Sequence, residues 1–426
     1  MTAAGALDRR LGTRDAVVIG LGSMIGAGVF SAFAPAAAAA GSALLIGLAI
    51  AAGVAYCNAV ASAQLAARYP TSGGTYVYGR ERLGEWWGFA AGWGFVIGKT
   101  ASCAAMALTF AAYAVPGPTW IQRLVAVLAV LGLTAVNLRG ITRTAALARI
   151  LVAGSLLALA VVVVVSLASG RAEPHNLALS DLSAGPFGVL QSAGLLFFAF
   201  AGYARIATLG EEVRDPSRTI PRAIPIALGI VVAVYLLVGA AALLVAGSGA
   251  IARSTAPLAT AMEAAGAWWA LPVVRVGAMV ASLGALLALI AGIGRTALAM
   301  AREGDLPRTL ATVDSRHLVP HHAELTIAAA VAVLIATTDL RGAIGFSSFG
   351  VLTYYAIANA AAYTQPAEDR RWPRALNVIG LLGCVALVVT LPLPAILAGL
   401  AVLAVGLLAR GLLRTRTPPV TPARAG

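Results

Sequence analysis

Twelve apolar stretches of membrane-spanning length dominate the 426-residue chain. About 20 mostly apolar residues in a helix cross the hydrocarbon core of a bilayer, so each stretch predicts one transmembrane helix. Only 11% of the residues are charged, whereas about a quarter are charged in soluble domains. The chain is therefore predicted to be an all-α integral membrane protein. The predicted spans are 15–39, 42–66, 86–114, 120–138, 146–168, 187–209, 223–247, 271–300, 323–339, 343–363, 374–391 and 394–413.

The first predicted span contains a segment that is poorly suited to a continuous helix. Gly20, Gly22, Gly26 and Gly28 fall within nine residues, and each glycine costs roughly 1 kcal/mol in a helix relative to alanine. A helix broken here would expose backbone N–H and C=O groups to a ligand. Close helix packing through small residues would account for the same spacing. These two interpretations stay open at the level of spacing alone.

The sixth predicted span carries weaker break signals, namely one glycine, small residues and Arg205 well inside the span. Two interrupted helices in matching positions of two five-helix halves are typical of inverted-repeat transporters. In that geometry a half-helix N-terminus attracts an anionic group, and unwound carbonyls accept hydrogen bonds from an ammonium. The pair of breaks therefore suits a zwitterion such as an α-amino acid. The halves would cover residues 15–168 and 187–363, with two additional helices in 374–413.

The distribution of arginine predicts the orientation in the membrane. With a cytoplasmic N-terminus, 23 arginines fall in inner segments and five in outer segments. Positive residues collect in cytoplasmic loops, so segment 1–14 and tail 414–426 are predicted to be cytoplasmic. The net charge of +13 is accounted for by this asymmetry, and no nucleic-acid partner is expected.

Five segments carry recognisable motifs, and they are 22–30, 69–78, 197–203, 211–224 and 295–307. In this order they resemble motifs of the amino acid–polyamine–organocation superfamily of permeases. The first is similar to the signature G-x-x-I-G-x-G-I-F and the second to P-x-S-G-G-x-Y-x-Y. The resemblance covers roughly residues 14 to 365. It implies a LeuT-type fold, a 5+5 inverted repeat with broken helices 1 and 6, and transport of amino acids or related amines.

The resemblance also implies a substrate site made mainly of backbone groups. The substrate carboxylate would meet the N–H groups of Ala27 and Gly28, with Gly26 between the half-helices. Phe200 and Tyr203 would form an aromatic gate or pocket wall, with ordinary helix packing as the alternative. The carbonyls implied for the substrate ammonium are those of Met24, Phe198, Ala199 and Ala201.

Two positions depart from the family pattern. Many relatives carry Asp in helix 6 where this chain has Ala204-Arg205. Some proton-coupled relatives carry Lys in helix 5, where this chain has Arg149 near the start and Ser155. That proton device is therefore absent or lies elsewhere.

Lys99 is the single lysine of the chain and lies inside the third predicted span. At 1.5 Å per residue it lies roughly 20 Å from the start of the helix. A charge at this depth costs several kcal/mol unless it faces a polar cavity or titrates. Lys99 is therefore a candidate for proton coupling, and a fixed ammonium that donates to carbonyls of a broken helix is the alternative. It would repel a cationic substrate, which favours neutral or anionic amino acids.

These patterns predict a secondary active transporter that moves amino acids across the plasma membrane by alternating access, with proton coupling as an open question. A polyamine or other organic amine permease or exchanger is the alternative, because the backbone contacts serve any ammonium. An integral membrane enzyme would need catalytic side chains clustered inside the spans, and the spans carry no such cluster. We therefore expect no enzyme activity, no catalytic residues, no cofactor and no metal site. The expected partners are the substrate and the lipid bilayer, and whether protons are a partner stays open.

Overall fold

The computed structural model describes residues 11–70, 73–140, 145–178, 185–207, 212–314, 316–317 and 319–416. These residues form a helical bundle, with one isolated β-bridge between Leu11 and Val213. Most of the predicted termini, 1–10 and 417–426, and residues 71–72 of the second motif lie outside the described residues. The α-helices are α1 (Thr13–Met24), α2 (Ala27–Ser31), α3 (Phe33–Ala40), α4 (Leu44–Arg68), α5 (Thr75–Leu83), α6 (Glu85–Ala114), α7 (Thr119–Leu138), α8 (Ala145–Ala168), α9 (Gly185–Phe200), α10 (Ala204–Ala207), α11 (Pro216–Arg253), α12 (Pro257–Ala264), α13 (Leu271–Arg302), α14 (His321–Thr337), α15 (Leu340–Tyr363), α16 (Arg374–Thr390) and α17 (Leu393–Arg416). The 3-10 helices are η1 (Gly41–Ala43), η2 (Pro174–Leu177), η4 (Ala201–Tyr203), η5 (Trp268–Ala270), η6 (Arg308–Ala311) and η7 (Ala367–Asp369).

The lengths of the helices fit a multi-pass membrane protein. Nine helices within the described ranges are long and apolar enough to cross a membrane. α14 and α16 are apolar but shorter, with 17 residues each, and α15 carries buried Ser347, Ser348 and Asn359. Each of the twelve predicted spans overlaps helical residues in the part of the chain that the structure describes. The count of twelve crossings itself stays a prediction.

The first span is broken where the glycines gather. α1 ends at Met24 and α2 begins at Ala27. Between them, Ile25 has ψ 67° and Gly26 has φ −116° and ψ −147°, which lie outside the helical range. The Gly26 N–H donates to the Met24 carbonyl at 2.8 Å, and no side chain caps the start of α2. The predicted break in this helix is confirmed.

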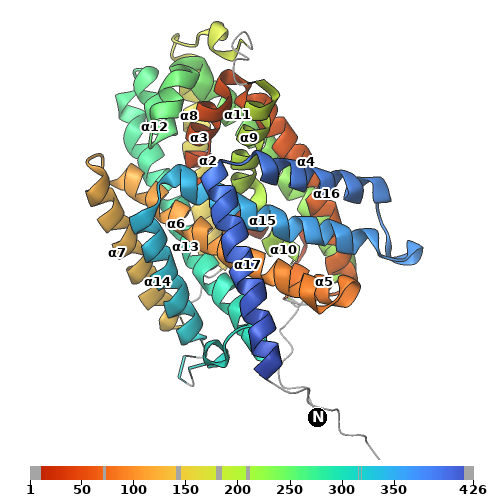
Figure 1. Cartoon of the computed structure of the whole chain (residues 1–426). Coiled ribbons are helices and arrows are strands. Elements are labelled where there is room, and N and C mark those ends of the chain that lie inside the picture. The colour runs from red at the N-terminus through yellow and green to blue at the C-terminus, as the bar shows by residue number, and fades with distance from the viewer. Residues whose placement is uncertain are drawn as a thin grey trace, which may run out of the picture.

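The sixth span is interrupted at the segment that the sequence singles out. α9 ends at Phe200, η4 makes one tight turn, and α10 adds four residues. A stretch of 3-10 helix inside a span often marks a functional hinge. Figure 1 shows α9 and α10 in the middle of the bundle, with α7 beside α14 at one edge and α15 beside α16 at the other.

Two glycines allow the interrupted helices to touch. A Cβ atom on Gly28 would lie 2.6 Å from the Cα of Ala199, and one on Gly202 would overlap the carbonyl oxygen of Ser23. Real Cβ atoms do not approach backbone so closely, so both contacts require glycine at these positions. The two breaks are thereby held face to face.

Contacts between helix ends pair segments that the arginine distribution assigns to the same side. Leu11 exchanges backbone hydrogen bonds with Glu212 and Arg214, and Arg149 forms an ion pair with Asp15 at 2.9 Å. Those contacts join segments predicted to lie on the cytoplasmic side. Three further hydrogen bonds join segments predicted to lie on the outer side, and they link Arg123 with Ala336, Arg171 with Ala264, and Arg341 with Gln191. The bundle therefore has two distinct ends, each with its own set of arginine contacts.

Candidate functional site

A cavity of about 370 Å³ lies between the two interrupted helices. α1 and α2 contribute residues on both sides of their break, from Gly22 to Gly28. α9, η4 and α10 contribute Phe198, Ala199, Ala201, Gly202, Ala204 and Arg205. The cavity is therefore bordered by the parts of the chain whose backbone departs from regular helix.

α6 and α13 supply the remaining long walls. On α6 the lining residues are Phe95, Lys99, Ser102 and Met106, whose spacing places them on one face of a helix. On α13 they are Ala285, Ala288, Leu289, Gly292, Arg295, Thr296 and Ala299. The wall is thus largely apolar and made of small side chains near the breaks.

Tyr235 of α11 ties the two breaks together. Its hydroxyl oxygen lies 2.6 Å from the Met24 carbonyl and 3.1 Å from the Ala199 carbonyl. A tyrosine hydroxyl has one proton to donate, so it serves one of these carbonyls at a time. The Tyr235 ring also lies 5.2 Å from that of Phe200, between centroids. Tyr235 therefore sets the spacing between two of the carbonyls that were predicted to meet a substrate ammonium.

Lys99 contacts the carbonyl of Ala201, which is another of the carbonyls predicted to meet a substrate ammonium. Its Nζ donates to the Ala201 carbonyl at 3.1 Å, and the side chain is only 7% exposed. This is the hydrogen bond expected of a fixed ammonium at a broken helix. The protein's own cation therefore occupies the Ala201 carbonyl in this conformation.

The structure separates the predicted site residues into two groups. Phe200 and Tyr203 lie behind the wall and are fully buried. Tyr203 stacks on Tyr355 at 4.9 Å between ring centroids, which matches the alternative of helix packing. The predicted residues that line the cavity are Met24, Gly26, Ala27, Gly28, Lys99, Phe198, Ala199 and Ala201.

The cavity opens toward the end of the bundle where α5 and the C-terminal end of α13 lie. Here the lining includes Tyr76, Arg205, Glu212 and Arg295. Arg205 Nη2 lies 3.8 Å from Glu212 Oε1. At the opposite end, the Tyr113 hydroxyl donates to the Phe30 carbonyl at 2.8 Å and accepts the Leu258 N–H at 3.1 Å. One end is thus open and polar, while the other is closed by packed aromatic residues.

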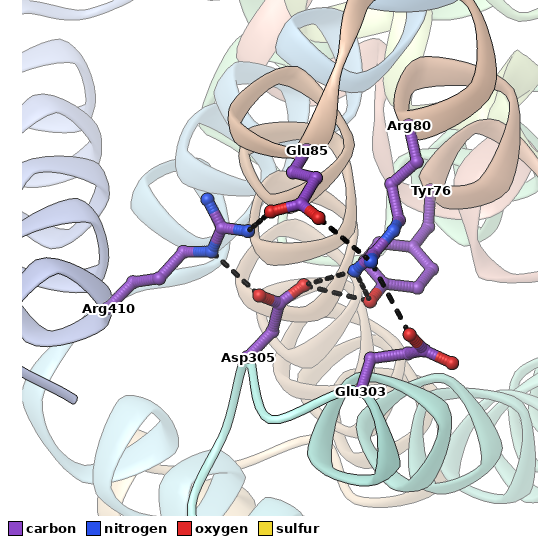
Figure 2. A network of polar contacts seen from close by, with 6 residues as sticks. All are labelled: Tyr76, Arg80, Glu85, Glu303, Asp305 and Arg410. Atoms are coloured by element: carbon purple, nitrogen blue, oxygen red, sulfur yellow. Dashed lines mark hydrogen bonds and ion pairs between the residues drawn. The ribbon is translucent and has the colours of Figure 1, made fainter. Parts of the chain in front are cut away.

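A charged network fixes the position of Tyr76 at the mouth of the cavity. Figure 2 shows Asp305 between Arg410 of α17 and the pair Arg80 and Tyr76 of α5. Asp305 accepts from Arg410 Nε at 2.7 Å, from the Tyr76 hydroxyl at 2.8 Å and from Arg80 Nη1 at 3.2 Å. Burial, and next the hydrogen bond to Asp305, raise the pKa of the Tyr76 hydroxyl well above its ordinary value, so it remains a donor at physiological pH.

Three residues of this region were not identified as functional from the sequence. Tyr235 is the single aromatic residue in the predicted span 223–247, and that isolation was the available signal. Gly202 lay inside a recognised motif, but its contact with Ser23 depends on the fold. Arg410 was counted only as a cytoplasmic charge. No group of three or more His, Cys, Asp or Glu side chains in the described residues could hold a metal ion.

Comparison with known proteins identifies the family of the chain. A family model described as amino acid permease matches residues 11–403. An uncharacterized transporter of Mycobacterium tuberculosis is 61% identical over 411 residues, which cover 96% of this chain and 92% of that protein. The branched-chain amino acid permease BcaP of Bacillus subtilis is 26% identical over 397 residues, covering 88% and 85%. Cationic amino acid transporter 4 of Homo sapiens is 29% identical over 374 residues, covering 82% of this chain and 58% of that protein.

Proposed function

Because the chain belongs to the amino acid permease family, we propose that it is a secondary active transporter that carries amino acids across the plasma membrane by alternating access. Family membership makes it a membrane transporter and not an enzyme. Two of these relatives are named for branched-chain and for cationic amino acids, so the relatives differ among themselves in side-chain class. The cavity between the two breaks is the observation that carries the proposal.

The substrate backbone is proposed to bind across the two breaks. Its carboxylate would meet the N–H groups of Ala27 and Gly28, where a helix starts without a side-chain cap, because such an end attracts anions. Its ammonium would meet the Phe198 carbonyl and whichever of the Met24 and Ala199 carbonyls Tyr235 leaves open. The small residues on α13 leave room for the substrate side chain.

The conformation is proposed to face the cytoplasm. The open end carries Glu212, Arg295 and α5, in segments that the arginine distribution assigns to the inside. The closed end is sealed by Phe30, Tyr113 and the start of α12. The proposal includes cytoplasmic termini, twelve spans and the 5+5 inverted repeat.

Lys99 is retained as the candidate for proton coupling. It is buried and borders the cavity, so gaining or losing its proton would change the charge that a substrate meets. Lys99→Ala is expected to lose the response of uptake to an inward proton gradient. A gradient response that persists in this variant would remove Lys99 from coupling.

Uptake of radiolabelled amino acids into proteoliposomes tests the proposed function. Gly28→Leu is expected to abolish uptake, because the new side chain would overlap Ala199 at the break. Gly53→Leu is the matched control, since Gly53 is exposed on α4 and a Cβ there meets nothing within 4 Å. Uptake by Gly28→Leu at the rate of the control would contradict a site at the breaks.

A further inference from the structure

We propose that the cavity selects substrates by side-chain charge, accepting acidic amino acids and rejecting cationic ones, with Lys99 as the residue that determines this specificity. The inference rests on the proposed function and adds the substrate class. It is carried by the charges that line the cavity and by the contacts of the Lys99 ammonium.

The lining of the cavity is strongly biased toward positive charge. Among the described residues it holds three cations, Lys99, Arg205 and Arg295, and one carboxylate, Glu212. Glu212 lies 3.8 Å from Arg205, so its charge is already opposed by a protein cation. Glu324 lies outside the lining, close to Gly294, and its charge partly opposes that of Arg295. A lysine or arginine substrate would therefore enter a field of like charge, which costs binding energy.

Lys99 is the cation placed deepest in this wall. Its ammonium has three donors, and the hydrogen bond it makes within the described chain goes to the neutral Ala201 carbonyl. No described carboxylate lies within 4.0 Å of Nζ. Taking an ion out of water costs several kcal/mol unless an opposite charge compensates. A substrate carboxylate is the compensating charge that the described protein does not supply here.

The position of Lys99 relative to the breaks decides which carboxylate it meets. Ala201, its partner, follows two residues after Ala199, which touches Gly28. The α-carboxylate has its own donors at the start of α2. Lys99 instead projects from α6, on the face shared with Ser102 and Met106, where a substrate side chain would lie. A side-chain carboxylate can therefore reach the Lys99 ammonium while the α-carboxylate remains at α2.

The same arrangement argues against a polyamine. A polyamine carries several cations and no carboxylate, so it has no partner for Ala27 and Gly28 and meets Lys99 and Arg295 as like charges. Lys99 also occupies the Ala201 carbonyl that an ammonium ligand would use. The lining thus disfavours the amine-carrier alternative.

Ligand-induced thermal stabilisation of the purified chain tests this inference, because a ligand that binds the folded state raises its apparent stability. The panel is aspartate and glutamate, their isosteric amides asparagine and glutamine, and lysine, arginine and spermidine. An acid is expected to bind at least tenfold more tightly than its amide, with no stabilisation by lysine, arginine or spermidine. Equal or tighter binding of the amides or the cations would overturn the proposed specificity while leaving amino acid transport intact. Absence of stabilisation by every amino acid would count against both proposals.

The variant Lys99→Met tests whether Lys99 determines the preference for acids over amides. It keeps the approximate length of the side chain and removes its charge. The ratio of acid affinity to amide affinity is expected to fall at least tenfold in this variant. An equal loss for acid and amide would place Lys99 on the shared α-carboxylate and overturn its role in specificity. Arg295→Gln provides a second variant on α13, and it is expected to reduce the same ratio by less because Arg295 is exposed at the mouth.

Discussion

Two buried cations, Lys99 and Arg410, differ in the groups that the protein places around them. Arg410 is fully buried, but Asp305 accepts from its Nε at 2.7 Å and Glu85 lies 3.8 Å from its Nη2. Its guanidinium also lies 4.5 Å from the centre of the Trp86 ring. Lys99 is buried almost as deeply, yet its hydrogen bond goes to a neutral carbonyl. The comparison teaches that the protein supplies carboxylates to one buried cation, whereas the other has only a neutral carbonyl within the described residues.

The largest expected effect comes from removing the carboxylate that satisfies Arg410. Asp305→Asn should destabilise the protein by ~3–5 kcal/mol, because it leaves a buried guanidinium without its strongest partner. Tyr76 and Arg80 lose the same acceptor. A large fall in the apparent melting temperature in detergent would be the readout.

Lys99→Met tests the other buried cation of the comparison, Lys99. Removing a buried charge that has no paired carboxylate should leave the melting temperature of the ligand-free protein unchanged or raise it. Equal destabilisation by Lys99→Met and Asp305→Asn would show that the two cations play the same structural role, and the comparison would fail.

A matched pair of tyrosine variants gives the next largest effect. Tyr76→Phe removes a hydrogen bond to Asp305, so it should cost about 1 kcal/mol of stability with a modest change in ligand affinity. Tyr235→Phe removes the hydroxyl that spans the Met24 and Ala199 carbonyls, so it should weaken amino acid binding severalfold. Melting temperature and ligand titration, measured on both variants, check the assignment. A larger loss of affinity in Tyr76→Phe than in Tyr235→Phe would reverse it.

The smallest expected effect is at the mouth of the cavity. Glu212→Gln breaks the ion pair with Arg205. The Glu212 side chain is 37% exposed and that of Arg205 is 43% exposed, and exposed ion pairs contribute less than about 1 kcal/mol to stability. The melting temperature should hardly change. Affinity for an acidic amino acid should rise slightly, because the lining loses its carboxylate. A fall in that affinity would show that the charge of the mouth does not act as proposed.

Much of the architecture could be predicted because it depends on local sequence. Four glycines made a broken helix one of two open interpretations, the family motif implied the break at Gly26, and the apolar runs matched the helices. The lining by residues from Met24 to Gly28 followed from that break. Length and composition of the described helices give nine spans, since α14 and α16 are short and α15 carries buried polar side chains.

The remaining features depend on contacts between segments far apart in the chain. Tyr235 lies 211 residues from Met24, and Asp305 lies 105 residues from Arg410. The sequence pattern around one residue does not predict a partner so far away in the chain. Phe200 and Tyr203 illustrate the same limit, since helical spacing could not tell which aromatic faces point into the cavity and which pack against Tyr235 and Tyr355.

A structure of the purified protein bound to the acidic amino acid that stabilises it most would test the central claim directly. The account predicts the α-carboxylate at the N–H groups of Ala27 and Gly28, and the side-chain carboxylate within hydrogen-bond distance of Lys99 Nζ. A ligand bound outside the cavity between the two breaks, or one whose side chain points away from Lys99, would contradict it.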